Sequence, residues 1–169
     1  GAISNCTLIG SRAGAAINNT GANSTVAIGH SALTALTNGV ANTALGYQSM
    51  LAETQGDRNT AIGYQALKTQ NGVDGTVGNT AVGYTGGYSI TTGKFNTIMG
   101  YEGLYNGTTA SGSVMIGVRA GFNVTTGNSN IAIGSGSMGV ATVTGNNNIA
   151  IGTHTGDALT SGTLNILIG

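Results

Sequence analysis

The chain has no proline, no tryptophan, a single cysteine and only ten formally charged side chains among its 169 residues. The absence of proline excludes a collagen-like fold, and Cys6 has no second cysteine for an intrachain disulfide. Five Lys and Arg residues are too few for a nucleic-acid-binding surface. No apolar run approaches the roughly 18 residues of a membrane span. We therefore expect no nucleic-acid partner and no membrane insertion.

Glycine is abundant instead, with 31 residues, and a net charge of zero with 40% hydrophobic residues argues against disorder. A hydrophobic residue followed by glycine recurs ten times, at intervals of 19, 17, 17, 20, 17, 17, 17, 18 and 17 residues. Such a period is typical of a repeat protein. The array predicts one repeat domain over residues 1–169. These marker glycines are Gly10, Gly29, Gly46, Gly63, Gly83, Gly100, Gly117, Gly134, Gly152 and Gly169.

The residues around each marker glycine predict short strands and turns. Asn59–Ile62 is rich in β-branched residues and reads as a short strand. The marker glycine ends it at a bend that needs a positive φ or has no room for a side chain. Tyr64–Leu67 predicts a second short strand or an extended corner. We therefore expect an all-β, parallel β-solenoid of about ten 17-residue coils, stacked at about 4.8 Å.

Four columns of equivalent residues precede the marker glycines. The position directly before the marker is always aliphatic or Met (the aliphatic column), and the position two earlier alternates Thr with Val and Ile (the threonine column). Because Thr and Val are near isosteres, we expect both columns to point into the coil. The intervening alanine column, which includes Ala44, Ala61 and Ala81, would then point outward. An outward apolar stripe along a rod would need burial against other chains, which favours a homotrimer.

The asparagine column lies one residue before the threonine column and contains Asn in seven of ten copies, with Cys6, Thr25 and Ser113 in the others. We expect it to form a ladder of amide side chains bonded from coil to coil. At its position in this column, Cys6 is expected to be a buried thiol.

Two nine-residue words, Asn42–Met50 and Asn59–Leu67, resemble the NTAIGYQAL repeats of bacteriophage tail-fibre proteins. Asn128–Gly134 and Asn23–Gly29 are similar to the shorter NSVAIG repeats of trimeric autotransporter adhesin heads. The resemblance covers essentially the whole chain. It implies a parallel homotrimer of β-rolls on a virion or a bacterial cell surface, which attaches to a host receptor and performs no catalysis. The 17-residue coil is longer than the adhesin-head coil, which leaves its cross-section and handedness open.

Four tyrosines that directly follow marker glycines are the first candidate receptor site. Tyr47, Tyr64, Tyr84 and Tyr101 (the tyrosine column) could stack on the sugars of a surface glycan, or could stack on one another at a corner of the coil. Tyr88, Tyr105 and Phe122 form a sparser second column, with the same two alternatives. Insertions that lengthen three coils are the second candidate site, because insertions on one edge of a repeat protein often bind ligands. The longest contains Asn71 and Asp74.

No residue pattern indicates catalysis, a cofactor or a metal. Glu53 and Asp57 could be offered as a carboxylate pair for a polysaccharide depolymerase, but beside Arg58 they read better as surface charge. His30 and His154 lie too many coils apart to share a metal within one chain.

We therefore expect a structural and host-receptor-binding segment of a trimeric phage tail fibre, with a bacterial surface glycan or protein as its receptor. The first alternative is the head of a bacterial trimeric adhesin. The second is an ice-binding β-solenoid, which the column Thr43, Thr60, Thr80 and Thr97 invites, although an inward threonine column argues against it.

Overall fold

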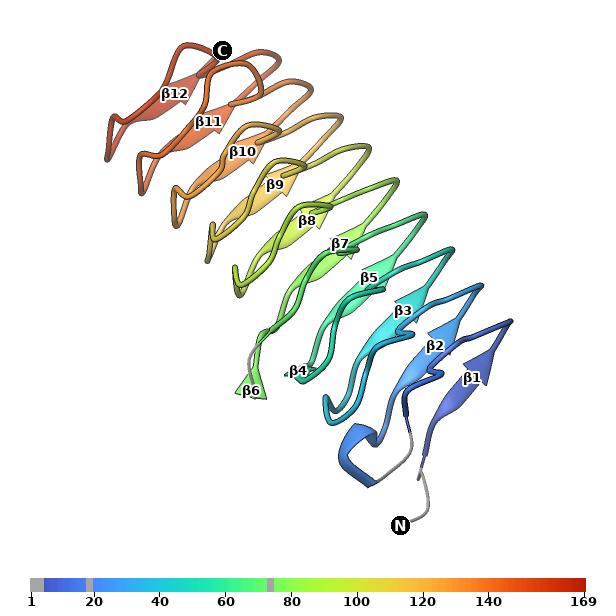
Figure 1. Cartoon of the computed structure of the whole chain (residues 1–169). Helices are drawn as coiled ribbons and strands as arrows, with labels where there is room; N and C mark the ends of the chain where they lie inside the picture. Colours follow the sequence, from blue (N-terminus) through green and yellow to red (C-terminus); the bar gives the residue numbers. More distant parts are fainter. Residues whose placement is uncertain (1–4, 18–19, 73–74) are drawn as a thin grey trace.

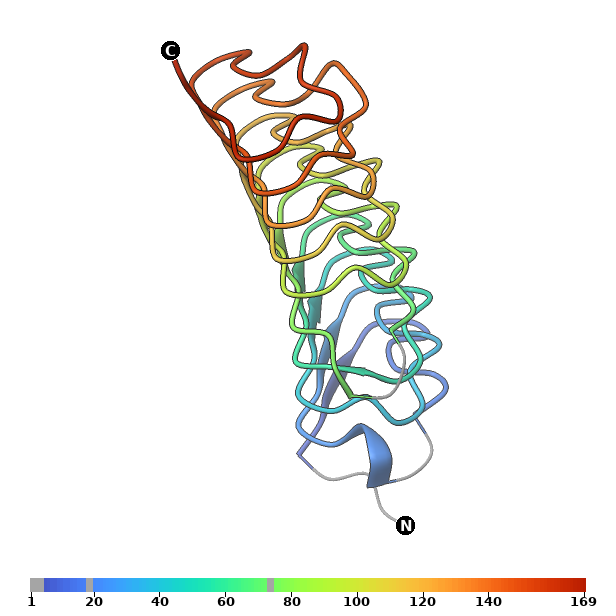
Figure 2. The ribbon, with the colours of Figure 1, turned by 90° about the vertical axis from the view of Figure 1, so that its left-hand side faces the viewer.

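The computed structural model describes residues 5–17, 20–72 and 75–169. It forms a parallel β-solenoid in which ten short strands lie side by side along a rod, with the two termini at opposite ends (Figure 1). A second view shows the coils stacked along the rod axis (Figure 2). The ten-stranded sheet consists of β1 (Thr7–Ile9), β2 (Val26–Ile28), β3 (Thr43–Leu45), β5 (Thr60–Ile62), β7 (Thr80–Val82), β8 (Thr97–Met99), β9 (Val114–Ile116), β10 (Ile131–Ile133), β11 (Ile149–Ile151) and β12 (Ile166–Ile168).

The expected β-solenoid is confirmed, and its register is the one that the repeat predicts. Thr60 pairs with Thr43 and Thr80, and every strand pair of the ten-stranded sheet aligns equivalent positions of neighbouring repeats. The 20-residue interval adds a small parallel pair, β4 (Gly56–Asp57) and β6 (Gly75–Thr76). Among the described residues the only helical element is the short 3-10 turn η1 (Thr20–Ala22).

The expected second strand in each coil is wrong. Tyr47–Met50 and Tyr64–Leu67 are turns, in which Gln48 (φ 53°) and Met50 (φ 50°) adopt the left-handed conformation. The equivalent residues of other coils also have a positive φ. The position of Met50 is occupied by Leu or Met in some coils and by Gly in the others, as at Gly87 and Gly121. The alternation of Leu, Met and Gly therefore follows from a backbone conformation that Gly adopts at least cost.

The marker glycines are required for two reasons at once. Gly117 has a φ of 132°, and a Cβ placed on it would lie 2.7 Å from the carbonyl oxygen of Gly134 in the next coil. Each of the nine markers from Gly10 to Gly152 would meet the following marker in the same way. The coils therefore stack closely only because this column has no side chains.

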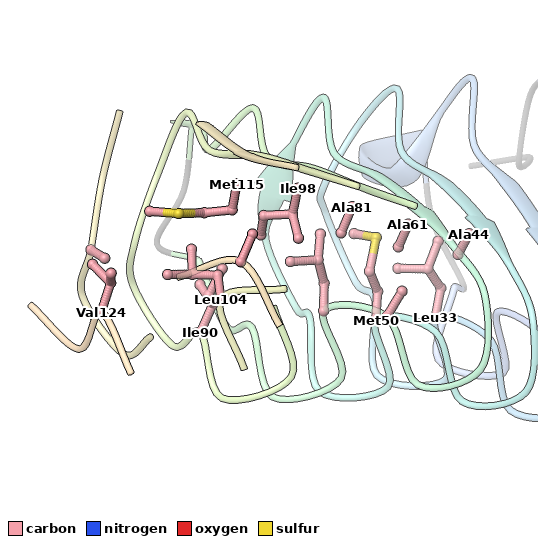
Figure 3. Packing of buried hydrophobic residues seen from close by; sticks show 14 of the residues in the cluster. Leu33, Ala44, Met50, Ala61, Ala81, Ile90, Ile98, Leu104, Met115 and Val124 are labelled. Carbon is pink, nitrogen blue, oxygen red and sulfur yellow. The ribbon is translucent and has the colours of Figure 1, made fainter. Parts of the chain in front are cut away.

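The predicted orientation of the strand side chains is also wrong. Ala44, Ala61 and Ala81 are completely buried, and Figure 3 shows them pointing from the sheet toward Leu33 and Met50. In the eight inner strands the alanine column points into the core, while the threonine and aliphatic columns point outward and remain partly or largely exposed. The exchange of Thr with Val does not show which face of the strand is buried, because a partly exposed strand position accepts both residues.

The small side chains of the alanine column match a thin core. A turn glycine makes room for a large residue of this column in the same or the next coil: a Cβ on Gly14 would lie 2.8 Å from Leu8 of its own coil, and one on Gly87 would lie 2.9 Å from Ile98 of the next coil. A Cβ on Gly121 would collide with Met115. Within one coil the exchange is visible in the sequence for Leu8 with Gly14 and for Met115 with Gly121, and both pairs indicate an inward alanine column.

Candidate interaction surfaces

The outer surface of the ten-stranded sheet has the same composition along the whole length of the rod. We call the outward residues of its ten strands the sheet face. It consists of the threonine column (Thr7, Val26, Thr43, Thr60, Thr80, Thr97, Val114, Ile131, Ile149 and Ile166) and the aliphatic column (Ile9, Ile28, Leu45, Ile62, Val82, Met99, Ile116, Ile133, Ile151 and Ile168). Ile9, Leu45 and Met99 are each more than two-fifths exposed.

Charge is segregated from the sheet face. None of the five Lys and Arg or the five Asp and Glu occupies any of its twenty positions. The nearest charged side chains along the chain, such as Arg58 and Glu102, belong to the turns before and after the strands. A continuous, uncharged strip of aliphatic and Thr side chains along a rod is the kind of surface that often marks an interaction site.

The tyrosine column lies beside the sheet face, directly after the bend at the marker glycines. Tyr47, Tyr64, Tyr84 and Tyr101 stack in sequence with ring centroids 5.1–5.2 Å apart, and His30 extends the stack beyond Tyr47 at 5.4 Å. Each tyrosine remains 41–47% exposed. Because neighbouring rings cover both faces of Tyr47, Tyr64 and Tyr84, these three residues present ring edges and hydroxyl groups to a ligand rather than ring faces.

Polar side chains run alongside the tyrosine column. Gln65 donates a hydrogen bond from Nε2 to Oε1 of Gln48 at 2.8 Å, and Arg119 pairs through Nε with Oε2 of Glu102 at 2.8 Å. The neighbouring Glu102 carboxylate raises the pKa of the Tyr101 phenol above its usual value, first as a hydrogen-bond acceptor and second through its negative charge. Tyr101 is therefore a neutral phenol at physiological pH.

The second aromatic column lies four residues further along each coil. Tyr88, Tyr105 and Phe122 stack with centroids 5.1 and 5.2 Å apart. Cations cover its two ends, since Lys68 Nζ lies 5.3 Å from the Tyr88 ring centre and the Arg119 guanidinium lies 4.7 Å from that of Phe122. Both aromatic columns thus stack internally, which was one of the two alternatives drawn from the sequence.

The asparagine column forms the expected amide ladder inside the coil. Asn96 donates from Nδ2 to Oδ1 of Asn79 at 3.1 Å and to the carbonyl of Ala110 at 2.8 Å, and its Oδ1 accepts from the backbone N–H of Ser113 at 3.0 Å. The same pattern continues at Asn130 and Asn148. This column is a structural element of the core. Cys6 at its end is half-buried rather than buried, and its Sγ donates to the carbonyl of Ala22.

The longest insertion is supported from inside by Glu53. This carboxylate is buried rather than on the surface as expected: Oε1 accepts the backbone N–H groups of residues 54–56, and Oε2 accepts from Gln70 Nε2 at 2.7 Å and Gly72 N at 3.2 Å. Asn71 is exposed and accepts a hydrogen bond from Thr54 Oγ1 at 2.7 Å. Asp74 lies outside the described residues.

Glu53 and Asp57, the suggested carboxylate pair, each accept hydrogen bonds from different parts of the backbone and have separate structural roles. While Glu53 holds the turn, Asp57 Oδ1 accepts the backbone N–H of Val40 in the preceding coil at 2.8 Å. Within the described ranges there is no pocket and no cluster of three potential metal ligands. His30 stacks on Tyr47, and His154 pairs with Asp157 at 2.9 Å. No helix in the described part of the chain is long and apolar enough to cross a membrane.

Comparison with known proteins returns no match: no family model, no curated protein and no solved structure is similar to this chain.

Proposed function

We propose that the chain is a non-catalytic segment of a homotrimeric attachment fibre, of the kind found in phage tails, and that its copies associate through the sheet face. The observation that carries the proposal is the sheet face itself, an uncharged strip that continues over all ten strands. Burial of its aliphatic side chains would stabilise the assembly by about 25 cal/mol per Å² of apolar surface removed from water. The number of chains, three, rests on the resemblance to tail-fibre and adhesin-head repeats.

The composition along the sheet face favours parallel copies in the same register. Its threonine column carries Thr at residues 43, 60, 80 and 97, and only Val or Ile at residues 114, 131, 149 and 166. Parallel copies bring Thr hydroxyls to the same level as other Thr hydroxyls, and Ile to the level of Ile. Antiparallel copies would place hydroxyl groups against aliphatic side chains and leave them without partners.

The receptor would then contact the surfaces that remain outside the interface. These are the longest insertion, around Asn71, and the exposed edge of the tyrosine column. The proposed partner is a glycan or protein on a bacterial cell, and the proposed location is the virion. The alternative location, a bacterial cell surface, goes with the adhesin-head resemblance.

A binding assay on intact bacteria tests the receptor function. Fluorescently labelled chain should bind saturably to a subset of strains, and Asn71→Ala or Tyr64→Ala should weaken this binding while Thr109→Ala, in another exposed turn, leaves it unchanged. Absence of saturable binding to every strain and to a glycan array would contradict the receptor function without affecting the fibre assembly.

Ice binding is the second candidate, because one specific observation now favours it. Thr43, Thr60, Thr80 and Thr97 point outward from a regular parallel sheet, so the argument that they are buried no longer applies. Their neighbours in the aliphatic column are four different residues, Leu45, Ile62, Val82 and Met99, which makes a less regular surface than ice would require. A monomer with thermal hysteresis that Thr60→Lys abolishes would establish this alternative.

A further inference from the structure

An exposed phenylalanine lies in the coil that follows the longest insertion. Phe95 is 59% exposed, and its backbone N–H donates to the carbonyl of Val77, the residue after β6, at 2.9 Å. Every tyrosine and Phe122 stacks on another ring, whereas no ring in the described part of the chain stacks on Phe95. Phe95 is therefore better placed than the tyrosines to receive a ligand on its ring.

The backbone conformation of Phe95 is unfavourable for a phenylalanine. Phe95 has a φ of 59°, and the equivalent residues of the coils before and after it are glycines, Gly78 (φ 63°) and Gly112 (φ 66°). Leu33 and Met50 also have a positive φ, but both are completely buried, so that core packing offsets the cost of their conformation. The largely exposed Phe95 has no such compensation. Its presence does not follow from the stability of the fold and points to a role in binding.

Three side chains converge around Gly78. A Cβ placed on Gly78 would lie 3.1 Å from Cδ1 of Phe95 and 3.7 Å from Cγ2 of Thr76, so the ring and the methyl group flank the same glycine. Nη1 of Arg58 donates a hydrogen bond to Oγ1 of Thr76. Because Thr76 belongs to β6, the insertion itself holds the cationic group near the aromatic one. We call Arg58, Thr76 and Phe95 the Phe95 site.

The guanidinium of Arg58 is open to an anionic ligand. Arg58 is exposed, and within the described ranges it has no ion pair with a carboxylate. Asp57, its neighbour in the chain, accepts the N–H of Val40 in the preceding coil, on the side away from Phe95. Guanidinium groups bind carboxylates and phosphates through paired hydrogen bonds, and the negative face of an aromatic ring attracts the C–H groups of a sugar. The Phe95 site thus offers one contact for a sugar ring and one for an acidic group that the sugar carries.

We propose that the Phe95 site binds the receptor, and that the receptor is an acidic polysaccharide of a bacterial cell, with uronic acid or phosphate groups. Phe95 stacks on a sugar ring, Arg58 pairs with the acidic group, and Thr76 orients the guanidinium. This inference rests on the proposed attachment function and names the chemical class of the receptor. It also assigns the stacking contact to Phe95, since neighbouring rings cover the inner members of the tyrosine column.

An array of uronic-acid, phosphorylated and neutral oligosaccharides tests the ligand class without bacteria. We expect the chain to bind the carboxylated or the phosphorylated set severalfold more tightly than the neutral one, and the set that binds identifies the acidic group. Phe95→Gly should weaken this binding by about tenfold, and Arg58→Gln should weaken it severalfold. Leu164→Gly is the matched control and should bind unchanged. Leu164 occupies the same position of its coil as Phe95, with a φ of 60° and 78% exposure, but lies far from the insertion.

Urea denaturation separates a binding role of Phe95 from a structural one. Phe95→Gly should shift the unfolding midpoint little, because relief of the left-handed conformation offsets the lost contact with Gly78. A large shift to lower urea would show that Phe95 serves the fold and would overturn the proposal. Equal binding of acidic and neutral oligosaccharides, binding of neither, or an unchanged affinity in Phe95→Gly would overturn it as well.

Intact bacteria distinguish failure of the site from failure of the attachment function. Saturable binding to a strain that persists in Phe95→Gly would overturn the Phe95 site and leave attachment intact. Binding that protease treatment of the bacteria removes would indicate a protein receptor and contradict the acidic polysaccharide. Binding that survives protease but is lost in Phe95→Gly is the result that we expect.

Discussion

At the scale of the residue, the marker glycines set the distance between coils. Gly117→Ala would place a Cβ 2.7 Å from the Gly134 carbonyl oxygen and would also force alanine to a φ of 132°. We expect a loss of about 3–5 kcal/mol in the free energy of unfolding, measured by urea denaturation. Gly75→Ala is the matched control, because Gly75 has a φ of 108° but no described atom within 4 Å of the added Cβ. It should cost about 1–2 kcal/mol, and equal losses in the two variants would contradict the close-approach argument.

The asparagine column gives a second prediction at this scale. Asn96→Ala leaves the carbonyl of Ala110 and the N–H of Ser113 without their side-chain partner inside the coil. We expect a loss of about 2–4 kcal/mol in thermal or urea unfolding. Asn96→Ser should cost less, because Ser113 already occupies this column and its Oγ accepts the N–H of Asn130 at 3.2 Å. A serine variant as unstable as the alanine variant would show that the acceptor oxygen is not what matters.

At the scale of the element, the orientation of each three-residue strand decides which substitutions it tolerates. Ala61 points into a thin core, whereas Thr60 is partly exposed on the sheet face. Ala61→Leu should therefore destabilise the chain by about 1–3 kcal/mol through overpacking. Thr60→Val should change its stability by no more than about 0.5 kcal/mol. Chemical denaturation of both variants measures this, and the reverse ranking would restore the opposite orientation.

The strands were predictable from the sequence because their spacing repeats, and the register of Thr43, Thr60 and Thr80 follows directly from that period. The orientation of the strand side chains could not be predicted from their alternation along the strand, because alternation defines two faces of the sheet without showing which one is buried. The sequence nevertheless contains the deciding evidence, in the pairing of Leu8 with Gly14 and of Met115 with Gly121. The left-handed turns at Gln48 and Met50 could not be inferred from those residue types, which seldom adopt a positive φ.

For the interaction surfaces, the sequence identifies the residues of each column but not the distances between them. The tyrosine column could be listed from the repeat, but its stacking at 5.1–5.2 Å depends on the fixed distance between coils. The column of Glu53 holds Ile17, Leu36 and Ile90 in other coils, and this pattern was the signal that the position is buried. The acidic side chain obscured that signal, because its backbone and Gln70 partners could not be read from the sequence. Its carboxylate is stable there because five N–H groups converge on it.

At the scale of the whole molecule, a charge on the sheet face should separate the copies without unfolding them. Ile62→Lys places an ammonium in the middle of the proposed interface, where burial without a partner costs several kcal/mol. We expect dissociation to folded monomers with an unchanged far-ultraviolet circular dichroism spectrum. Thr109→Lys, in an exposed turn away from the strands, is the matched control and should leave the assembly intact. Dissociation by both variants, or by neither, would argue against the sheet face as the interface.

The mass of the chain in solution tests the central claim most directly. One copy has a mass of 16.6 kDa, and sedimentation equilibrium at micromolar concentration measures the assembled mass without reference to shape. Association through the sheet face into a homotrimer predicts a single species of three times that mass. A species of 16.6 kDa at micromolar concentration would contradict it, because the uncharged sheet face would then be exposed to water along the whole rod.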